Sequence, residues 1–141
     1  MDAGIVEIVC VVVGAAIAIL TDIVWNWYNQ KKNEKHNARL LYYDLKSVTK
    51  YVLHHVIYED KTFLSIRYNT DWQIVLMELE NLNLEQVELI YDFYDAVYDY
   101  NEMKNMEKLK ELEQFVKNSK FKNMINSVKV KAKISNDTKE S

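Results

Sequence analysis

The sequence predicts a mainly all-α fold, in which one N-terminal transmembrane helix continues into a cytoplasmic helical bundle that has room for a small two-stranded ribbon. Three observations predict it. Residues 8–20 are uninterrupted apolar or small residues. The chain of 141 residues has no proline, and its two glycines lie within the first 14 residues, so later segments lack the strongest helix breakers. Beyond the span, apolar residues recur at intervals of three and four, as on one face of a helix.

We expect three regions: a transmembrane helix over 1–27, a helical domain over 28–134 and a disordered tail, SNDTKES, over 135–141. With 49% hydrophobic and 28% charged residues, the middle region has the composition of a folded domain. Cys10 is the only cysteine, which excludes disulfides and cysteine zinc sites within one chain.

The span has the length and the flanks of a membrane helix. From Ile5 to Trp25 it would measure roughly 31 Å, against a hydrocarbon core of about 30 Å. Aromatic and basic residues typical of a membrane interface follow it: Trp25, Trp27, Tyr28, Lys31, Lys32 and Lys35. The positive-inside rule then places the N-terminus outside and the remainder in the cytoplasm. Sixteen lysines against two arginines, with frequent asparagine, favour a bacterial or phage source, so we expect the inner membrane of a bacterium. A cleaved signal peptide is the alternative, and it fits less well because no basic segment precedes the apolar run.

One side of the span is small and polar. At ~100° per residue, one stripe collects Glu7, Cys10, Gly14, Ala18, Thr21 and Asp22, and aliphatic residues occupy most of the other side. Small residues let helices approach closely, and acids in a membrane normally face protein or water. The stripe therefore favours a homo-oligomer, in which Glu7 and Asp22 would form two rings about 22 Å apart that select cations. Alternatively, the two acids mark the membrane boundaries.

The first helix should run on to about Ile57, with an apolar stripe beside a basic stripe that begins at Lys31 and ends at Lys50. Residues 62–68 alternate like a short strand. A capping box over 70–73 should open a helix that ends near Leu82.

A second capping box over 83–86 should open a helix over 84–103, apolar on two faces and hence central in a bundle. Between these faces lies an acidic strip: Glu85, Glu88, Asp92, Asp95, Asp99 and Glu102. We expect it to be solvated or paired with the basic stripe, and not to hold a metal, because no Glu-x-x-His motif accompanies it. A last helix should cover 105–127, interrupted at Asn118-Ser119. Residues 128–134 alternate and could pair with 62–68, or form a basic tail.

The sequence names no reaction. It has no nucleophile elbow, Walker loop, H-E-x-x-H motif or Cys/His cluster, so we expect neither an enzyme nor a cofactor. Aromatic and cationic residues that stack on bases and attract phosphates make a nucleotide or oligonucleotide ligand the candidate: Arg67, Tyr68, Trp72, Lys129 and Lys131. The alternative is that these aromatic residues pack the bundle.

Three strings, ARLLYYDLKSV (38–48), RYNTDWQIVLMELENL (67–82) and LIYDFYDAVYDYN (89–101), resemble small one-span bacterial proteins with a cytoplasmic helical domain. The plan is also similar to that of membrane effectors in bacterial anti-phage systems. In the Hailong-type channel effector, a short span oligomerises into a pore and oligonucleotide signals open it. The resemblance implies an oligomeric ion channel gated through its cytoplasmic domain in antiviral defence. The alternative is a non-conducting membrane adaptor that recruits a protein partner.

Overall fold

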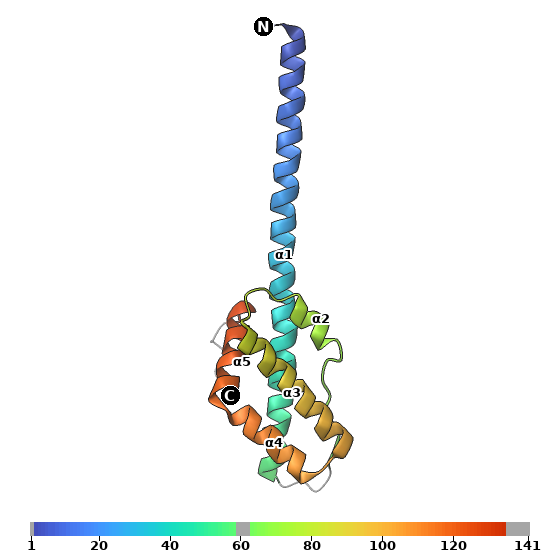
Figure 1. Ribbon diagram of the computed structural model, residues 1–141, viewed down its shortest axis with the longest axis vertical. Helices are drawn as coiled ribbons and strands as arrows, with labels where there is room; N and C mark the ends of the chain where they lie inside the picture. The colour runs from blue at the N-terminus through green and yellow to red at the C-terminus, as the bar shows by residue number, and fades with distance from the viewer. Residues whose placement is uncertain (1, 59–62, 135–141) are drawn as a thin grey trace. The chain divides into compact units, whose positions relative to one another are not determined.

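The computed structural model describes residues 2–54 and 63–134, together with the backbone of 55–58. Within these residues the chain is all-helical, as the sequence predicts, and no strand is present (Figure 1). The helices are α1 (Ala3–Tyr58), α2 (Trp72–Met77), α3 (Leu84–Met103), α4 (Met106–Lys117) and α5 (Ser119–Lys131). The tail predicted to be disordered, 135–141, lies outside the described residues.

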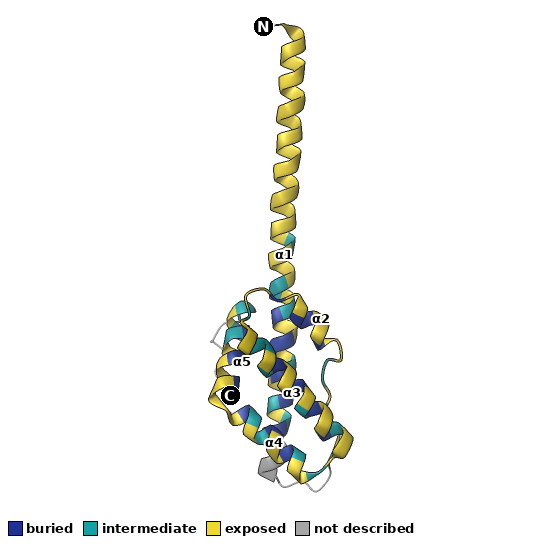
Figure 2. Ribbon diagram, viewed as in Figure 1, coloured by how far each residue is buried: buried dark blue, intermediate teal, exposed yellow. Residues whose placement is uncertain are grey.

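The chain divides into two compact units, Met1–Asn33 and Glu34–Ser141, and each is described by itself. The first unit is the apolar part of α1. Every residue from Asp2 to Tyr28 is exposed in the single chain, including the aliphatic ones (Figure 2). A helix with this surface is stable only if another apolar phase covers it.

The second unit, which we call the helical domain, has one hydrophobic core. The apolar stripe of α1 predicts buried residues at 41, 45, 48, 52, 55 and 56; the first four are buried, and the side chains of the last two lie outside the described residues. α3 packs against both α4 and α5, as expected of a central helix. At their junction the ring of Phe93 lies 4.8 Å from that of Phe121 and 6.0 Å from that of Phe115.

α3 begins and ends with defined caps. The Asn83 side chain accepts a hydrogen bond from the Gln86 amide at 2.8 Å, and the Gln86 side chain accepts one from the Asn83 amide at 3.1 Å. This is the predicted capping box, which satisfies two otherwise orphan amides. After Met103, Lys104 adopts a left-handed conformation with φ 45°, and its amide donates to the carbonyl of Tyr100 at 2.7 Å.

The earlier capping-box prediction, over 70–73, is wrong. Asp71 holds the N-cap position of α2, but its side chain makes no capping hydrogen bond. The Asp71 amide instead donates to the side chain of Asn69 at 3.0 Å, which forms a local turn. α2 also ends at Met77 and not near Leu82. The Leu79 N–H donates to the carbonyl of Leu76 at 3.1 Å, and Asn81, with φ 64°, lies outside the helical conformation.

The predicted last helix is interrupted at the predicted place. Asn118 is extended, with φ −63° and ψ 134°, and separates α4 from α5. Its side chain accepts a hydrogen bond from the Lys120 amide at 2.8 Å, so the residue that ends one helix caps the next.

The predicted two-stranded ribbon is wrong. Residues 128–131 belong to α5, and residues 63–69 form an extended loop without a strand partner, while residue 62 lies outside the described residues. Val128 is buried in helical register with Phe121 and Met124, whereas Val130 is 75% exposed. The helical period of the core therefore prevails over the local alternation.

Candidate functional site

The first candidate site is the surface of the membrane-length helix. Among the described residues, α1 is the one helix long and apolar enough to cross a membrane. This judgement rests on length and composition, and both a membrane anchor and a signal sequence satisfy it. All six stripe residues predicted from the sequence are exposed in the single chain: Glu7, Cys10, Gly14, Ala18, Thr21 and Asp22.

Two of these stripe residues have informative surroundings. The Thr21 hydroxyl donates to the carbonyl of Ile17 at 2.8 Å, so this polar group is satisfied within its own helix and can enter hydrocarbon. A Cβ placed on Gly14 would meet no other atom within 4 Å, so the single chain has room for a larger residue there.

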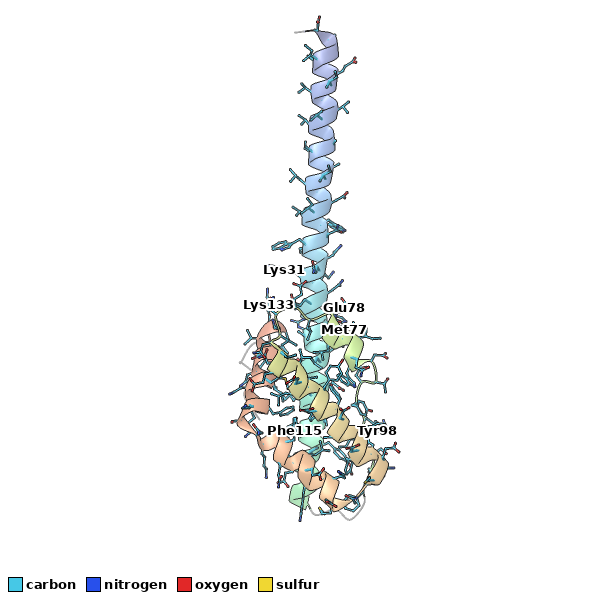
Figure 3. All side chains as sticks on the ribbon, viewed as in Figure 1. Lys31, Met77, Glu78, Tyr98, Phe115 and Lys133 are labelled. Atoms are coloured by element: carbon cyan, nitrogen blue, oxygen red, sulfur yellow. The ribbon has the colours of Figure 1, made fainter. Side chains whose placement is uncertain are left out.

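The interface residues form a contiguous group at the end of the apolar run. The rings of Trp25 and Tyr28 lie 6.4 Å apart, and the ammonium of Lys31, labelled in Figure 3, lies 4.0 Å from the centre of the Trp27 ring. Thr21, Trp25 and Tyr28 also line a shallow apolar groove on the surface of the helix. The described stretch therefore presents aromatic rings beside cations, as an interfacial belt requires. Lys32 and Lys35, predicted for the same belt, follow on α1, the first exposed and the second half-buried.

The second candidate site is the predicted ligand-binding cluster, whose aromatic members pack the domain. Trp72 is 7% exposed and stacks on Tyr94, with ring centres 4.4 Å apart and planes at 11°. Tyr91 meets the edge of the same indole at 4.8 Å, and Tyr68 lies 5.7 Å from Tyr94. Arg67 is exposed on the loop. Because one face of its ring is stacked on Tyr94 and the side chain is buried, Trp72 offers no free stacking surface in this conformation.

The two lysines predicted for the same cluster, Lys129 and Lys131, lie on α5. The Lys131 ammonium lies 4.0 Å from the Glu34 carboxylate, and both side chains are about four-fifths buried, at 19% and 21% exposure. Close by, the Arg39 guanidinium donates to the carbonyl of Ala132 at 3.1 Å, at the end of α5. Lys129 is half-buried. Lys131 and Arg39 thus attach the end of α5 to α1.

A side-chain network that the sequence interpretation missed holds the loop over 63–71. We call it the loop-anchoring network, and its members are Asp44, Tyr51, Tyr94, Tyr100 and Asn101. Asp44 accepts hydrogen bonds from the Tyr94 hydroxyl at 2.5 Å and from the Asn69 amide at 2.9 Å. Burial raises the pKa of Tyr94 above its ordinary value, and the hydrogen bond and negative charge of Asp44 raise it further. Tyr94 therefore stays a neutral donor through the physiological range.

The rest of the network binds the main chain of the loop. The carbonyl of Leu64 accepts hydrogen bonds from the hydroxyls of Tyr51 and Tyr100, at 3.0 Å and 2.9 Å. The Asn101 amide pairs with both main-chain groups of Ile66, accepting from its N–H at 2.7 Å and donating to its carbonyl at 3.0 Å. Burial, followed by the hydrogen bond with Tyr51, raises the pKa of Tyr100. These side chains supply the hydrogen bonds that a neighbouring strand would otherwise provide.

A shallow polar groove of about 260 Å³ lies between the start of α3 and α5. Across it the Lys120 ammonium and the Glu85 carboxylate form an ion pair at 2.9 Å, and both side chains are well exposed. The hydrogen bond to Glu85 raises the pKa of Lys120. This pair links two helices at the surface, where such pairs contribute little to stability.

No group of three or more His, Cys, Asp or Glu side chains that could hold a metal ion is found in the part of the chain that the structure describes.

Comparison with protein-family models, with curated proteins and with solved structures finds no match to this chain.

Proposed function

We propose that this chain is a single-span membrane protein of a bacterial inner membrane, with its N-terminus outside and its helical domain in the cytoplasm. In this proposal it acts as a homo-oligomer whose spans surround an ion-conducting pore, gated through the helical domain by a nucleotide-type ligand or a partner. The role in anti-phage defence rests on the similarity of plan alone.

The observation that carries the proposal is the stripe of small and polar residues on the membrane-length helix. Nothing within the single chain packs against this stripe. Glycine inside a helix costs roughly 0.5–1 kcal/mol relative to alanine. Nothing in the single chain crowds Gly14. A close approach of another helix would explain both the glycine and Ala18, one turn further along the same side.

The acids support a water-filled axis over a dry one. Glu7 and Asp22 fall within about 60° of each other on the helix, so the association that buries Gly14 would also bring both carboxylates toward the shared axis. Carboxylates there would be unfavourable in a dry interface and favourable around water and cations. The Thr21 hydroxyl donates its proton to the carbonyl of Ile17 within the same helix. Its oxygen can still accept a hydrogen bond from water along such a path.

The test begins with the mass of the full chain in detergent, measured by light scattering. We expect one closed oligomer of three or more chains for the native sequence and a shift toward monomer for Ala18→Ile. Ala16→Ile is the matched control, because Ala16 lies on the opposite side of the helix and should tolerate the same added volume. A native chain that is monomeric, or two variants that behave alike, would overturn the proposal.

Conductance is measured next, in planar bilayers. Glu7→Gln and Asp22→Asn keep the size of each side chain and remove its charge, so we expect cation selectivity to fall while the oligomer persists. An oligomer that conducts nothing would contradict the pore.

That outcome would favour a second candidate, a membrane-tethered adaptor that binds a protein through its helical domain. The observation that favours it is the burial of Trp72 between Tyr91 and Tyr94, which removes the ring most suited to stack on a base. Under the adaptor, both amide substitutions in the span should leave activity unchanged.

A further inference from the structure

The outer face of α3 is strongly acidic. Five of its carboxylates are exposed: Glu88, Asp92, Asp95, Asp99 and Glu102. At ~100° per residue they fall within about 80° of the helix circumference. Among the described residues none of them accepts a hydrogen bond or forms an ion pair, and α3 carries no lysine or arginine. Tyr91 and Tyr98, 38% and 56% exposed, run along one edge of this acidic face.

The outer face of α1 within the helical domain is basic. Arg39, Lys46 and Lys50 are exposed there, and Arg39 also donates through Nε to the carbonyl of Ala132. Leu40 and Tyr43 lie among them and are 42% and 56% exposed. We call this surface the basic face of α1, and the surface of α3 described above the acidic face of α3.

One chain cannot bring these two faces together. The inner side of α1 packs into the core and meets α3 through the hydrogen bond of Asp44 with Tyr94, so the outer sides of the two helices point in different directions. In Figure 2, exposed residues alternate with buried ones along the ribbon of α3. From the sequence we expect the acidic strip either to be solvated or to pair with the basic stripe over 31–50. In the described residues no ion pair joins α1 to α3.

We propose that the helical domain binds a second copy of this chain head to tail, with the acidic face of α3 on one protomer against the basic face of α1 on the next. The charges match in spacing as well as in sign. The three cations are separated by seven and four residues, and the acids offer the same separations. Glu88, Asp95 and Asp99 supply them in one chain direction, and Asp99, Asp92 and Glu88 supply them in the other. The exposed tyrosines on both faces add apolar contact area.

A second copy is the occupant that these faces fit, because each chain carries both halves of the contact. Such a contact is heterologous, and it generates a ring when the rotation between neighbours closes. The proposal rests on the homo-oligomer of the proposed function and adds to it a separate contact outside the span. Copies held in one membrane meet at high effective concentration, so a weak and salt-sensitive contact suffices.

Cross-linking of the full chain in vesicles tests the geometry. In a Cys10→Ser background, Tyr43→Cys marks the basic face and Tyr98→Cys marks the edge of the acidic face. With a short bis-maleimide, we expect a mixture of the two chains to cross-link and each chain alone to cross-link about tenfold less. Equal cross-linking by each chain alone, or none in the mixture, would overturn the proposal.

Charge reversal tests the chemistry in the same assay. Asp92→Lys with Asp95→Lys, or Lys46→Glu with Lys50→Glu, should each lower the cross-linking of the mixture about tenfold. A chain that carries all four changes keeps the native net charge and should recover. Failure of that chain to recover, while circular dichroism shows it folded, would overturn the proposal.

A matched control uses Glu78→Lys with Glu107→Lys, which changes the net charge by the same amount at exposed positions outside the acidic face. We expect it to leave the cross-linking intact, and a tenfold loss here would mean that net charge and not the two faces controls association.

Cross-linking at the native Cys10 reports on association of the spans, because Cys10 lies on the stripe. It therefore tests the proposed function separately from the contact between helical domains. Cross-links at Cys10 without cross-links between the two faces would overturn the contact of the helical domains and leave the span assembly standing. Cross-links between the faces without any at Cys10 would support the contact and count against assembly through the span.

Discussion

One helix, α1, carries two surfaces of opposite character, and the difference shows what its sequence pattern encodes. From Asp2 to Tyr28 every residue is exposed although most are apolar. Beyond Asn33 the same helix buries a residue at every third or fourth position, beginning with Ala38. The first pattern requires an apolar surrounding on nearly all sides, and the second requires a core on one side only. Periodicity, more than total hydrophobicity, therefore tells which part of the helix belongs to a folded domain.

Shortening a leucine in each part of α1 should destabilise the helical domain in one case only. Leu45→Ala removes a side chain that is 0% exposed and should lower the free energy of unfolding of the helical domain by about 2–5 kcal/mol. Leu20→Ala removes one that is 60% exposed, and it should leave that free energy unchanged within about 0.5 kcal/mol. Urea titration in detergent, followed by near-ultraviolet circular dichroism, measures both. Equal losses would mean that the span takes part in the domain core.

Tyrosine hydroxyls on α3 should contribute differently to stability at buried and at exposed positions. Tyr94→Phe removes a buried donor to Asp44, and hydrogen bonds to charged groups contribute about 1.5–3 kcal/mol, so we expect a loss of that size. Tyr98→Phe, one turn further along α3 and 56% exposed, should cost less than about 0.5 kcal/mol. The same urea titration decides the matter, and a neutral Tyr94→Phe would show that the loop-anchoring network contributes little.

Alkaline pH should separate the same tyrosines. The folded-state pKa of Tyr94 and of Tyr100 is raised, so the folded state holds these protons more tightly than the unfolded chain does. Their contribution to stability is therefore complete below pH ~10, the ordinary tyrosine pKa, and is lost as the pH rises above it. We expect stability to fall by about 1.4 kcal/mol per pH unit for each of the two.

The control is Tyr94→Phe with Tyr100→Phe, whose stability should decline less steeply above pH ~10. Absorbance at alkaline pH provides a second measurement, since Tyr94 and Tyr100, whose pKa values are raised, should ionise only when the domain unfolds. Equal slopes for the native and the double-variant chain would contradict the expectation.

The smallest expected effect concerns glycine. Lys104 ends α3 with φ 45°, a conformation that costs a residue with a Cβ roughly 1–2 kcal/mol, so Lys104→Gly should stabilise the domain by about 1 kcal/mol. Gly14→Ala should leave domain stability unchanged and weaken only the association of spans. A shift in the melting temperature measures the first change, and light scattering measures the second. Destabilisation by Lys104→Gly would show that the lysine side chain has a role of its own.

The sequence predicts the helices well because their cues are local. The Asn83 capping box, the break at Asn118 and the apolar stripe of α1 each depend on residues within a few positions of one another. Its errors arise where distant residues decide the structure. The alternation over 128–134 is a valid strand pattern in isolation, but Val128 falls in register with Phe121 and Met124 and follows the helix.

The candidate sites divide in the same way. The membrane stripe and the interface residues are visible in the sequence because the helical period alone places them. The loop-anchoring network is not, since Asp44 and Asn69 are brought together across 25 positions by the packing of the core. One signal for it does exist in the sequence. Asp44 stands next to Leu45 on the buried side of α1, and a carboxylate beside a core position requires hydrogen-bond donors.

The loop over 63–71 owes its path to hydrogen bonds that its main-chain atoms make at Leu64, Ile66 and Asn69. Between these anchors, the side chains of Ser65 and Arg67 point into solvent. The positions that fix the course of the loop and the positions that display chemistry are therefore different residues. Mutation can rewrite the displayed positions without disturbing the domain, which is the arrangement that recognition loops on rigid scaffolds have in common. The exposed positions of this loop can therefore change while its main-chain anchors hold its course, so a foreign peptide could be grafted there.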